Sequence, residues 1–572
     1  MTKFVFALIV AFLSFAAYSQ EIKKENLSKQ SSTYWDFNKT QIQSKGKYYV
    51  DELGQTNEKH GKWQYFDRLG ELEEERNYYR DMLYGEVILY YPNGKKRQQG
   101  YFKYDKQDSV YREWYETGNL KMEGTYINGV EIGHWKHYYV DGTLKSVEEI
   151  KGEDRYVWEF YLRDSLHTQL IKEGNGELVS YFTTGQVKEW YNYKNGLKDG
   201  PFEEFSIYGY TVLKGNFEEG LKSGKWEYAY YTGDIEKISN YKKGVLEGPY
   251  EYFYDNGKTN VKGQYKEGKK HGEWTWYTNQ GNRDMQGGFK NDLQEGDWTY
   301  WYPSGEVSYT AKFKEGLKTG QWTYFYKNGK KFKEGTFAND EKNGKWKTWY
   351  EDETLLMEGN YLNGKEQGEW LNYWESGELK NKGNFSKGLL NGEWKSYYPN
   401  GKPKLEGKYQ DEMKVGEWTE YFENGKVKDV QTYKLFKKKS KLDFAPLMKG
   451  HVIMESKLHG HSESYSGADY RLTEEGDYKE GLKHGEWIAY HPGGKNPAVV
   501  TSYKDGKLDG SMKTYSRRGK LLQETEYKDG LKHGKFVIYD SRGKVVKEMR
   551  FSEGMQIIEG SAGGGGSFTP GR

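Results

Sequence analysis

The chain has 572 residues, no cysteine, and an almost balanced charge, with 87 Lys and Arg against 85 Asp and Glu. A chain without cysteine has neither disulfides nor a lipid-modified N-terminal cysteine, and interleaved charges of both signs are typical of a solvated surface rather than a nucleic-acid-binding stripe. Aromatic residues make up 17% of the chain and aliphatic residues are sparse, so the expected core is a thin layer of large rings.

The N-terminus has the pattern of a secretory signal peptide. Lys3 precedes an apolar run from Phe4 to Ala17, and Ala17-Tyr18-Ser19 offers small residues for cleavage after Ser19. A membrane anchor is the less favoured alternative, because the run is shorter than the roughly 20 residues of a span. We therefore expect residues 1–19 to be a signal peptide, residues 20–45 a polar segment, and the protein to be exported to the periplasm or the outer membrane. Cell surface or secretion is less favoured.

Residues 46–433 are dominated by a repeat of 24 residues. The pattern Gly-x-aromatic recurs ten times from Gly200 to Trp418 at this spacing, and Gly61, Gly85 and Ser109 fall in the same register upstream. Two shorter units lie around residues 156–160 and 176–182. A strict period indicates one small unit stacked about twenty times. The ten aromatic residues are Phe202, Trp226, Tyr250, Trp274, Trp298, Trp322, Trp346, Trp370, Trp394 and Trp418.

Each unit has the pattern of a β-hairpin. In one repeat, residues 297–302 are rich in aromatic and β-branched residues, Pro303-Ser304-Gly305 interrupts them, and residues 306–313 form a second candidate strand. Asn-Gly occupies the same turn in several repeats, as at Asn400-Gly401, and favours the positive φ angles of tight hairpin turns. The expected fold is all-β, an elongated, twisted and curved single-layer antiparallel array of hairpins.

Side-chain alternation separates two faces of this array. With the repeat aromatic counted as position 0, positions 4, 9, 13 and 15 are expected on its face, and the glycine common at position 13 is expected opposite the tryptophan. The other face is polar apart from one ring at position 3. These rings are candidate partner-binding residues, with ordinary β-propensity and neighbour packing as the alternative: Phe253, Tyr277, Trp301, Phe325, Trp349, Tyr373, Tyr397 and Tyr421.

A basic insertion at residues 434–459 breaks the register before further repeats at 460–558. It mixes lysines with apolar residues, which suits docking on a partner or on anionic lipid head groups, and the alternative is a solvated loop between repeats. Its candidate binding residues are Phe436, Lys437, Lys438, Lys439, Lys441 and Phe444. Residues 559–572 resemble a linker and tag.

The sequence contains no pattern of catalytic residues. No phosphate-binding loop or nucleophile elbow is present, and the glycines are explained as turn residues. His459 and His461 share one side of an extended segment, but without a third and fourth ligand they do not define a metal site. We therefore expect no enzymatic activity, no cofactor, no metal and no nucleic-acid partner.

Gly392-Glu393-Trp394, Asn400-Gly401 and Gly407-Lys408-Tyr409 together resemble the MORN repeat in its bacterial variant, the YwqK-type antitoxin repeat. The resemblance extends from about Gly46 to Gly554 and implies stacked hairpins that serve as a binding scaffold, with no catalytic residues. The signal peptide argues against an antitoxin role, since a cytosolic antidote needs no export. Repeats of this variant with such a leader are similar to exported proteins of Bacteroidota, which implies an accessory role in outer-membrane type 9 secretion or gliding complexes.

The expected function is therefore a non-enzymatic cell-envelope scaffold that binds protein partners through an extended aromatic surface. The alternative is binding to glycan, such as peptidoglycan, or to a phospholipid surface, since evenly spaced rings can stack on sugars. The sequence leaves open the identity of the partner, the side of the envelope, the binding face, and the oligomeric state.

Overall fold

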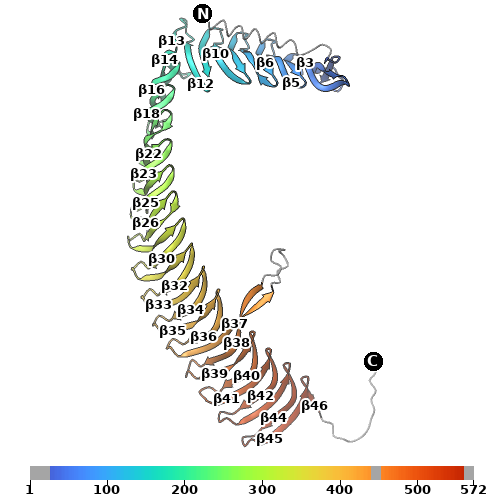
Figure 1. Ribbon diagram of the computed structural model, residues 1–572, viewed down its shortest axis with the longest axis vertical. Coiled ribbons are helices and arrows are strands. Elements are labelled where there is room, and N and C mark those ends of the chain that lie inside the picture. The colour runs from blue at the N-terminus through green and yellow to red at the C-terminus, as the bar shows by residue number, and fades with distance from the viewer. Residues whose placement is uncertain (1–25, 440–451, 559–572) are drawn as a thin grey trace. The chain divides into compact units, whose positions relative to one another are not determined.

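The structure, a computed structural model, describes residues 26–439 and 452–558. Its regular elements are 46 strands, which pair in antiparallel fashion in a single sheet layer (Figure 1). The expected all-β hairpin array is confirmed. The predicted signal peptide at 1–19 and the tail at 559–572 lie outside the described residues. In the described part of the chain, no helix has the length and apolar character needed to cross a membrane.

The chain divides into two compact units. The first runs to Gly272 and takes in Asn279–Gly281, and the second takes in Glu273–Thr278 and continues from Asn282. The strands up to the boundary are β1 (Ser31–Tyr34), β2 (Ile42–Asp51), β3 (Gly54–Phe66), β4 (Leu72–Tyr79), β5 (Met82–Tyr90), β6 (Lys96–Lys103), β7 (Lys106–Gln107), β8 (Ser109–Trp114), β9 (Leu120–Ile127), β10 (Val130–Tyr138), β11 (Leu144–Lys151), β12 (Asp154–Tyr161), β13 (Gln169–Lys172), β14 (Asn175–Tyr181), β15 (Val187–Lys194), β16 (Leu197–Phe205), β17 (Thr211–Glu218), β18 (Leu221–Ala229), β19 (Ile235–Lys242), β20 (Val245–Leu246), β21 (Gly248–Phe253) and β22 (Thr259–Lys266).

The remaining strands begin with β23, in whose span the boundary falls. They are β23 (Lys269–Tyr277), β24 (Arg283–Lys290), β25 (Leu293–Trp301), β26 (Val307–Lys314), β27 (Leu317–Lys318), β28 (Gly320–Phe325), β29 (Lys331–Ala338), β30 (Glu341–Trp349), β31 (Leu355–Leu362), β32 (Lys365–Tyr373), β33 (Leu379–Ser386), β34 (Leu389–Tyr397), β35 (Pro403–Gln410), β36 (Met413–Tyr421), β37 (Val427–Lys439), β38 (Val452–Tyr465), β39 (Leu472–Lys479), β40 (Leu482–Tyr490), β41 (Pro497–Lys504), β42 (Lys507–Tyr515), β43 (Leu521–Lys528), β44 (Leu531–Tyr539), β45 (Val545–Ser552) and β46 (Met555–Ile557).

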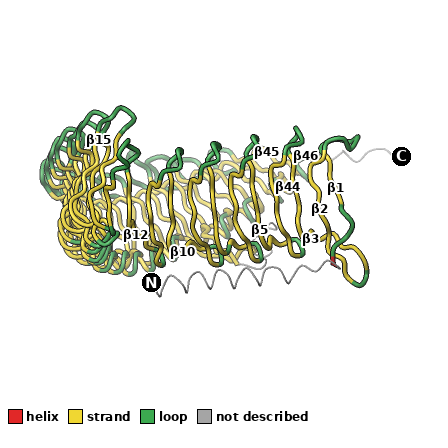
Figure 2. The backbone as a smooth tube through the Cα atoms, turned by 90° about the horizontal axis from the view of Figure 1, so that it is seen from above, coloured by secondary structure: helices red, strands yellow, loops and turns green. Residues whose placement is uncertain are grey.

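Two kinds of turn alternate along the two edges of the ribbon (Figure 2). Inside a hairpin only the glycine takes a positive φ, 78° at Gly401, while the asparagine before it keeps an ordinary conformation. The predicted reason for Asn-Gly was therefore incomplete. The side chain of Asn400 accepts the N–H of Lys402 at 3.0 Å and donates to the carbonyl of Glu423 in the next hairpin at 2.9 Å. The asparagine thus links neighbouring turns.

The turn between successive hairpins is the one with two left-handed residues. Glu315 and Gly316 have φ angles of 52° and 83°, and they connect Lys314 directly to its pairing partner Leu317. Positive φ at both central residues is the requirement of a type I′ turn, whose twist matches that of the flanking strands. Ser109 has a φ of 73° at a site where other repeats carry glycine, which confirms the predicted repeat register there.

The core is formed by the tryptophan row, and each indole covers the preceding repeat. Gly335 pairs across its own hairpin with Trp322, as predicted. The ring that lies over Gly335 is nevertheless Trp346 of the next repeat, because a Cβ added to Gly335 would overlap that indole. The Trp346 indole N–H also donates to the carbonyl of Thr336 at 3.1 Å. Each indole therefore joins two repeats, which couples neighbouring units in the stack.

Residue sizes at the two contacting positions are matched. Glycine lies under Trp298, Trp346, Trp370 and Trp418. Where position 13 is larger, the next position 0 is often smaller than tryptophan: Ser239 comes before Tyr250, Thr501 before Met512, and Thr525 before Phe536. Ala311 is followed by Trp322, which remains 5% exposed, so one methyl group is tolerated there. The indole needs nearly bare backbone beneath it.

Candidate partner-binding surface

The rings at position 3 lie on the face opposite the tryptophan row. In the hairpin of β25 and β26, Trp298 pairs with Ala311 and Tyr300 with Tyr309, but the register then shifts so that Trp301 pairs with Val307. Directly paired residues share a face. The prediction that position 9 lies on the tryptophan face was therefore wrong, because the β-bulge before the turn moves it to the other face.

The aromatic row of the second unit consists of these position-3 rings, each paired with its position-9 neighbour. Trp301 pairs with Val307, Phe325 with Lys331, Trp349 with Leu355, Tyr373 with Leu379, Tyr397 with Pro403, and Tyr421 with Val427. Tyr277 belongs to the same unit, and Phe253, which pairs with Thr259, belongs to the first unit. All eight predicted rings are half-buried.

Contacts along the row join one repeat to the next. The guanidinium of Arg283, at position 9 of one repeat, lies 5.8 Å from the ring centroid of Trp301 in the following repeat. Lys331 lies 5.9 Å from the ring of Trp349 in the same way. Cations at this distance are attracted to the faces of aromatic rings. The row is thus a band of partly exposed rings with aliphatic or cationic side chains between them.

Backbone hydrogen bonds hold these rings at a regular interval. The hydroxyl of Tyr302, at position 4, donates to the carbonyl of Phe325 in the next repeat at 2.7 Å, and Tyr326 donates to Trp349 at 2.8 Å. Tyr398 donates to the carbonyl of Tyr421 at 2.8 Å. Because each acceptor is the backbone of a position-3 residue, the tyrosines fix the place of the aromatic row. Such pre-ordering lowers the entropy lost on binding.

Ion pairs flank the row on the same face. Lys345 lies 2.8 Å from Glu358, and Lys395 lies 3.2 Å from Glu406. Glu406 also accepts a hydrogen bond from Tyr421. That bond, together with Lys395, lowers the pKa of Glu406 against the opposing effect of burial. Burial, the hydrogen bond and the charge of Glu406 raise the pKa of Tyr421 to about 12. The side chains that flank the row are therefore charged, and the lysines and glutamates neutralise one another in pairs.

The predicted insertion continues the sheet as a β-hairpin arm. Strands β37 and β38 extend past their neighbours, with Lys434 paired to Lys457 and Lys438 to Ile453, and the arm projects from the ribbon in Figure 1. Lys437 and Lys438 are exposed, whereas Phe436 is half-buried with its ring 5.3 Å from that of His459.

The described part of the arm is a strand pair rather than the solvated loop that we considered as an alternative. The Ser456 hydroxyl donates to the carbonyl of Lys414 at 2.6 Å, which fixes the root of the arm to β36. Lys439 ends the strand and its side chain is not described. Lys441 and Phe444 lie outside the described residues.

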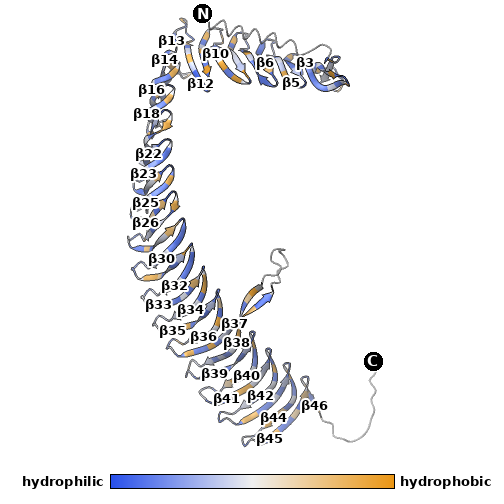
Figure 3. Cartoon of the chain, viewed as in Figure 1, coloured by the Kyte–Doolittle hydropathy of each residue, from blue (hydrophilic) through white to orange (hydrophobic). Residues whose placement is uncertain are grey.

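One row of apolar side chains was not identified from the sequence. The first residue after each type I′ turn is often leucine, and these side chains stay 40–52% exposed at Leu221, Leu293, Leu317, Leu389, Leu482 and Leu531. The sequence does show this leucine, five residues before the repeat aromatic. Its place in a short strand beside the turn gave no reason to single it out. Hydrophobic residues are otherwise distributed along the strands with hydrophilic residues between them (Figure 3).

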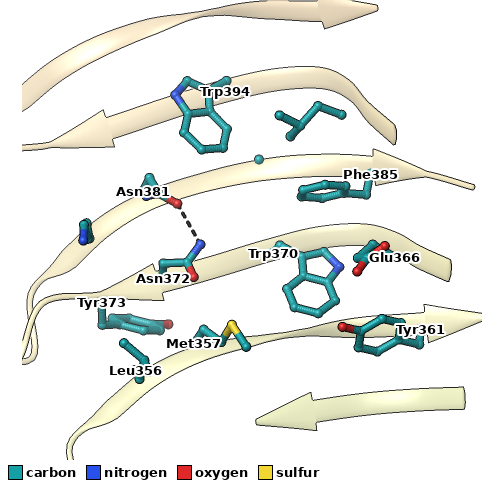
Figure 4. Close-up of a pocket in the computed structure, with 13 residues that line it drawn as sticks. Leu356, Met357, Tyr361, Glu366, Trp370, Asn372, Tyr373, Asn381, Phe385 and Trp394 are labelled. Atoms are coloured by element: carbon teal, nitrogen blue, oxygen red, sulfur yellow. Dashed lines mark hydrogen bonds between the residues drawn. The ribbon is translucent and has the colours of Figure 1, made fainter. Parts of the chain in front are cut away.

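A shallow pocket interrupts the tryptophan face in the second unit (Figure 4). It has a volume of about 490 Å³ and is lined by residues that include Trp370, Trp394 and Met357. Asn372 and Asn381 replace the paired aromatic residues found in the repeat of Tyr300, and the Asn372 side-chain N–H donates to Asn381 at 2.7 Å. Trp394 is half-buried here, whereas Trp370 is buried. The two smaller side chains thus leave indole surface accessible beside an amide pair.

Comparison with known proteins identifies the repeat. The family model described as MORN repeat variant matches eleven segments, at residues 59–78, 83–104, 107–128, 246–267, 294–315, 318–339, 342–363, 366–387, 390–411, 414–435 and 508–529. The chain is built from MORN-type repeats. Most matched segments begin near the start of the strand that carries the repeat aromatic and end at the next type I′ turn, so one repeat is one hairpin of the described sheet.

No curated protein matches the sequence. Among solved structures, the chain is similar to the crystal structure of TcdB2-TccC3, at 10% identity over 90% of this chain and 28% of that chain, with a TM-score of 0.13. The crystal structure of TcdB2-TccC3-Cdc42 matches at 11% identity over 93% and 26%, with a TM-score of 0.12. The chain spans about a quarter of the length of these chains. Likeness at these TM-scores carries no argument about function.

Proposed function

We propose that this protein is a non-enzymatic scaffold of the cell envelope that binds an extended segment of a partner protein along the aromatic row. The observation that carries the proposal is the recurrence of a half-buried ring at position 3 of seven successive repeats in one unit, each next to an aliphatic or cationic side chain. Rigid aromatic anchors of this kind are enriched at binding hot spots. A repeat array offers a long surface for them.

The spacing of the rings favours a partner in polyproline II conformation. Two strands per repeat place successive rings roughly 9.6 Å apart along the sheet, from the usual distance between neighbouring strands. A polyproline II helix has three residues per turn and rises about 9.3 Å per turn, so every third side chain meets a new ring. Aromatic-lined grooves recognise such segments in other domains. The exposed lysines of the arm provide a second contact for acidic residues of the same partner.

The envelope location is proposed from the leader-like residues 1–19, and an accessory role beside an outer-membrane secretion or gliding complex follows from the family resemblance alone. A fusion of residues 1–25 to a reporter that is active only after export tests the location. An inactive fusion whose reporter protein stays in the cytoplasmic fraction would contradict it. This result is independent of whether the aromatic row binds a partner.

Titration with a synthetic proline-rich peptide tests the proposed binding mode. We expect binding by the full chain, and at least tenfold weaker binding by the double variant Trp301→Ser, Trp349→Ser with unchanged circular dichroism. Tyr231→Ser is the matched control, because Tyr231 is 71% exposed in a hairpin turn and is not one of the position-3 rings. Equal binding of a glycine-serine peptide, or unchanged affinity of the double variant, would contradict the proposal.

The glycan alternative is favoured by the pocket beside Asn372 and Asn381. Indole faces stack on sugar rings, and side-chain amides both donate to and accept from hydroxyl groups. Sedimentation with purified peptidoglycan distinguishes this function from peptide binding. Loss of sedimentation on Asn381→Leu, with proline-rich peptide binding retained, would support the glycan function; no sedimentation of the unmodified protein would exclude it.

A further inference from the structure

A histidine surrounded by carboxylates lies on the aromatic-row face of the C-terminal repeats, on β38 and β39. The Nε2 atom of His461 is 3.4 Å from Glu463 Oε1 and 3.7 Å from Glu475 Oε2. One ligand atom from each of the three side chains falls within 4.8 Å of the others. In tetrahedral zinc sites the ligand atoms lie about 2.0–2.2 Å from the ion and hence roughly 3.3–3.5 Å from one another. The two separations from His461 Nε2 are close to these values.

The strand register is what brings these groups together. His461 pairs with Asp477, Ser462 with Gly476, and Glu463 with Glu475. Alternation places the buried Ser462 on the tryptophan face and the four ionisable side chains together on the opposite face. Two adjacent cross-strand pairs therefore converge on one point, and the half-exposed His461 side chain leaves that point open to solvent.

Each of the three candidate ligands is oriented by a second group. Tyr465 donates to Glu463 Oε2 at 2.6 Å, and Tyr490 of β40 donates to Glu475 Oε1, so the oxygen nearer His461 is the other one in both carboxylates. His461 Nδ1 lies 3.3 Å from Asp477 Oδ1. A carboxylate on Nδ1 holds the proton there and leaves the Nε2 lone pair for an ion, which is how metal-binding histidines are commonly oriented.

The side chains around Glu475 differ in charge from those at the same place in the repeat of Trp346. Glu358 occupies the place of Glu475 and is paired with Lys345 and Lys347, at 2.8 Å and 3.7 Å. In the C-terminal repeat these two lysine positions carry His461 and Glu463 instead. Within residues 26–439 and 452–558, no lysine or arginine forms an ion pair with Glu463, Glu475 or Asp477. The cluster therefore lacks the cations that neutralise the same site elsewhere, and a bound cation would replace them.

We propose that His461, Glu463 and Glu475 bind a divalent transition-metal ion of the zinc type, with Asp477 orienting the imidazole. One imidazole nitrogen with two carboxylate oxygens suits such ions better than Mg²⁺ or Ca²⁺, which prefer oxygen ligands alone. Three protein ligands leave a coordination position for water or for a partner's side chain. His459 is not one of the three residues whose ligand atoms converge, and its Nδ1 accepts the N–H of Glu480 at 3.3 Å. The proposed ligands beside His461 are thus two glutamates, and not His459, with which it did not define a metal site in the sequence.

Calorimetric titration of the full chain with Zn²⁺ tests the site, with Mg²⁺ and Ca²⁺ as comparison ions. We expect one Zn²⁺ per chain, at least a hundredfold weaker binding by His461→Ala, and about tenfold to a hundredfold weaker binding by Asp477→Asn. His459→Ala and His484→Ala are matched controls and should bind as the unmodified chain does. His484 lies 3.7 Å from a single carboxylate, that of Asp505.

We expect the circular dichroism of each variant to be unchanged, because these side chains lie on the aromatic-row face and not in the tryptophan core. An unchanged spectrum shows that a variant has lost the site and not the fold. No binding of Zn²⁺ by the unmodified chain would overturn the proposal. Binding that survives His461→Ala, or that His459→Ala removes equally, would also overturn it. None of these outcomes depends on whether the aromatic row binds a partner.

Discussion

Replacing Gly335 by serine tests the claim that each indole needs bare backbone in the preceding repeat. A side chain at Gly335 would overlap the Trp346 indole, which is 3% exposed and donates to Thr336. Displacing the ring removes one hydrogen bond, worth about 1 kcal/mol, and exposes part of the roughly 200 Å² that a tryptophan buries, at about 25 cal/mol per Å². We expect local destabilisation of about 2–5 kcal/mol.

Hydrogen exchange followed by mass spectrometry on the full chain measures this effect locally, since a long repeat array does not unfold in one step. Amides of β29 and β30 should exchange faster in Gly335→Ser. Adding Trp346→Tyr recreates the natural pair of Ser239 and Tyr250 and should restore about 1–3 kcal/mol. Unchanged protection in the single variant, or no recovery in the double variant, would refute the size-matching argument.

Three further predictions concern single side chains. Because the pKa of Tyr421 is raised to about 12, the stabilising effect of its hydroxyl should be complete below about pH 10 and lost as the pH rises through 12. In Glu406→Gln the tyrosinate absorbance should rise at lower pH than in the unmodified chain. An unchanged curve of absorbance against pH would contradict this. Tyr326→Phe removes the bond to Trp349 and should destabilise β30 by about 1 kcal/mol in hydrogen exchange, whereas equal protection would show that the bond contributes nothing. Ser109→Gly removes the cost of a left-handed backbone conformation at a serine and should stabilise β8 by up to about 1 kcal/mol, measured as slower hydrogen exchange. Faster exchange would argue against strain at Ser109.

Much of the fold can be predicted from the sequence because its information is local and periodic. The 24-residue interval sets the hairpin, the glycines at the turns supply the left-handed angles that tight connections require, and the glycine at Gly335 signals a close approach by a ring. The aromatic row at Trp301 and Trp349 follows from alternation along a single strand. The lysine-rich hairpin at Phe436 was recognised as a departure, although its strand pairing was not.

The sequence alone does not determine which side chains meet across neighbouring strands. Which indole covers Gly335 depends on the direction of the Trp346 side chain across a repeat boundary. The face on which Val307 lies depends on a β-bulge that no residue type predicts. His461 and Glu475 are 14 residues apart and meet because β38 and β39 pair in one register. A shift of that register by one residue would send these groups to opposite faces. Local periodicity therefore determined the repeat, and only the tertiary pairing decided which side chains share a site.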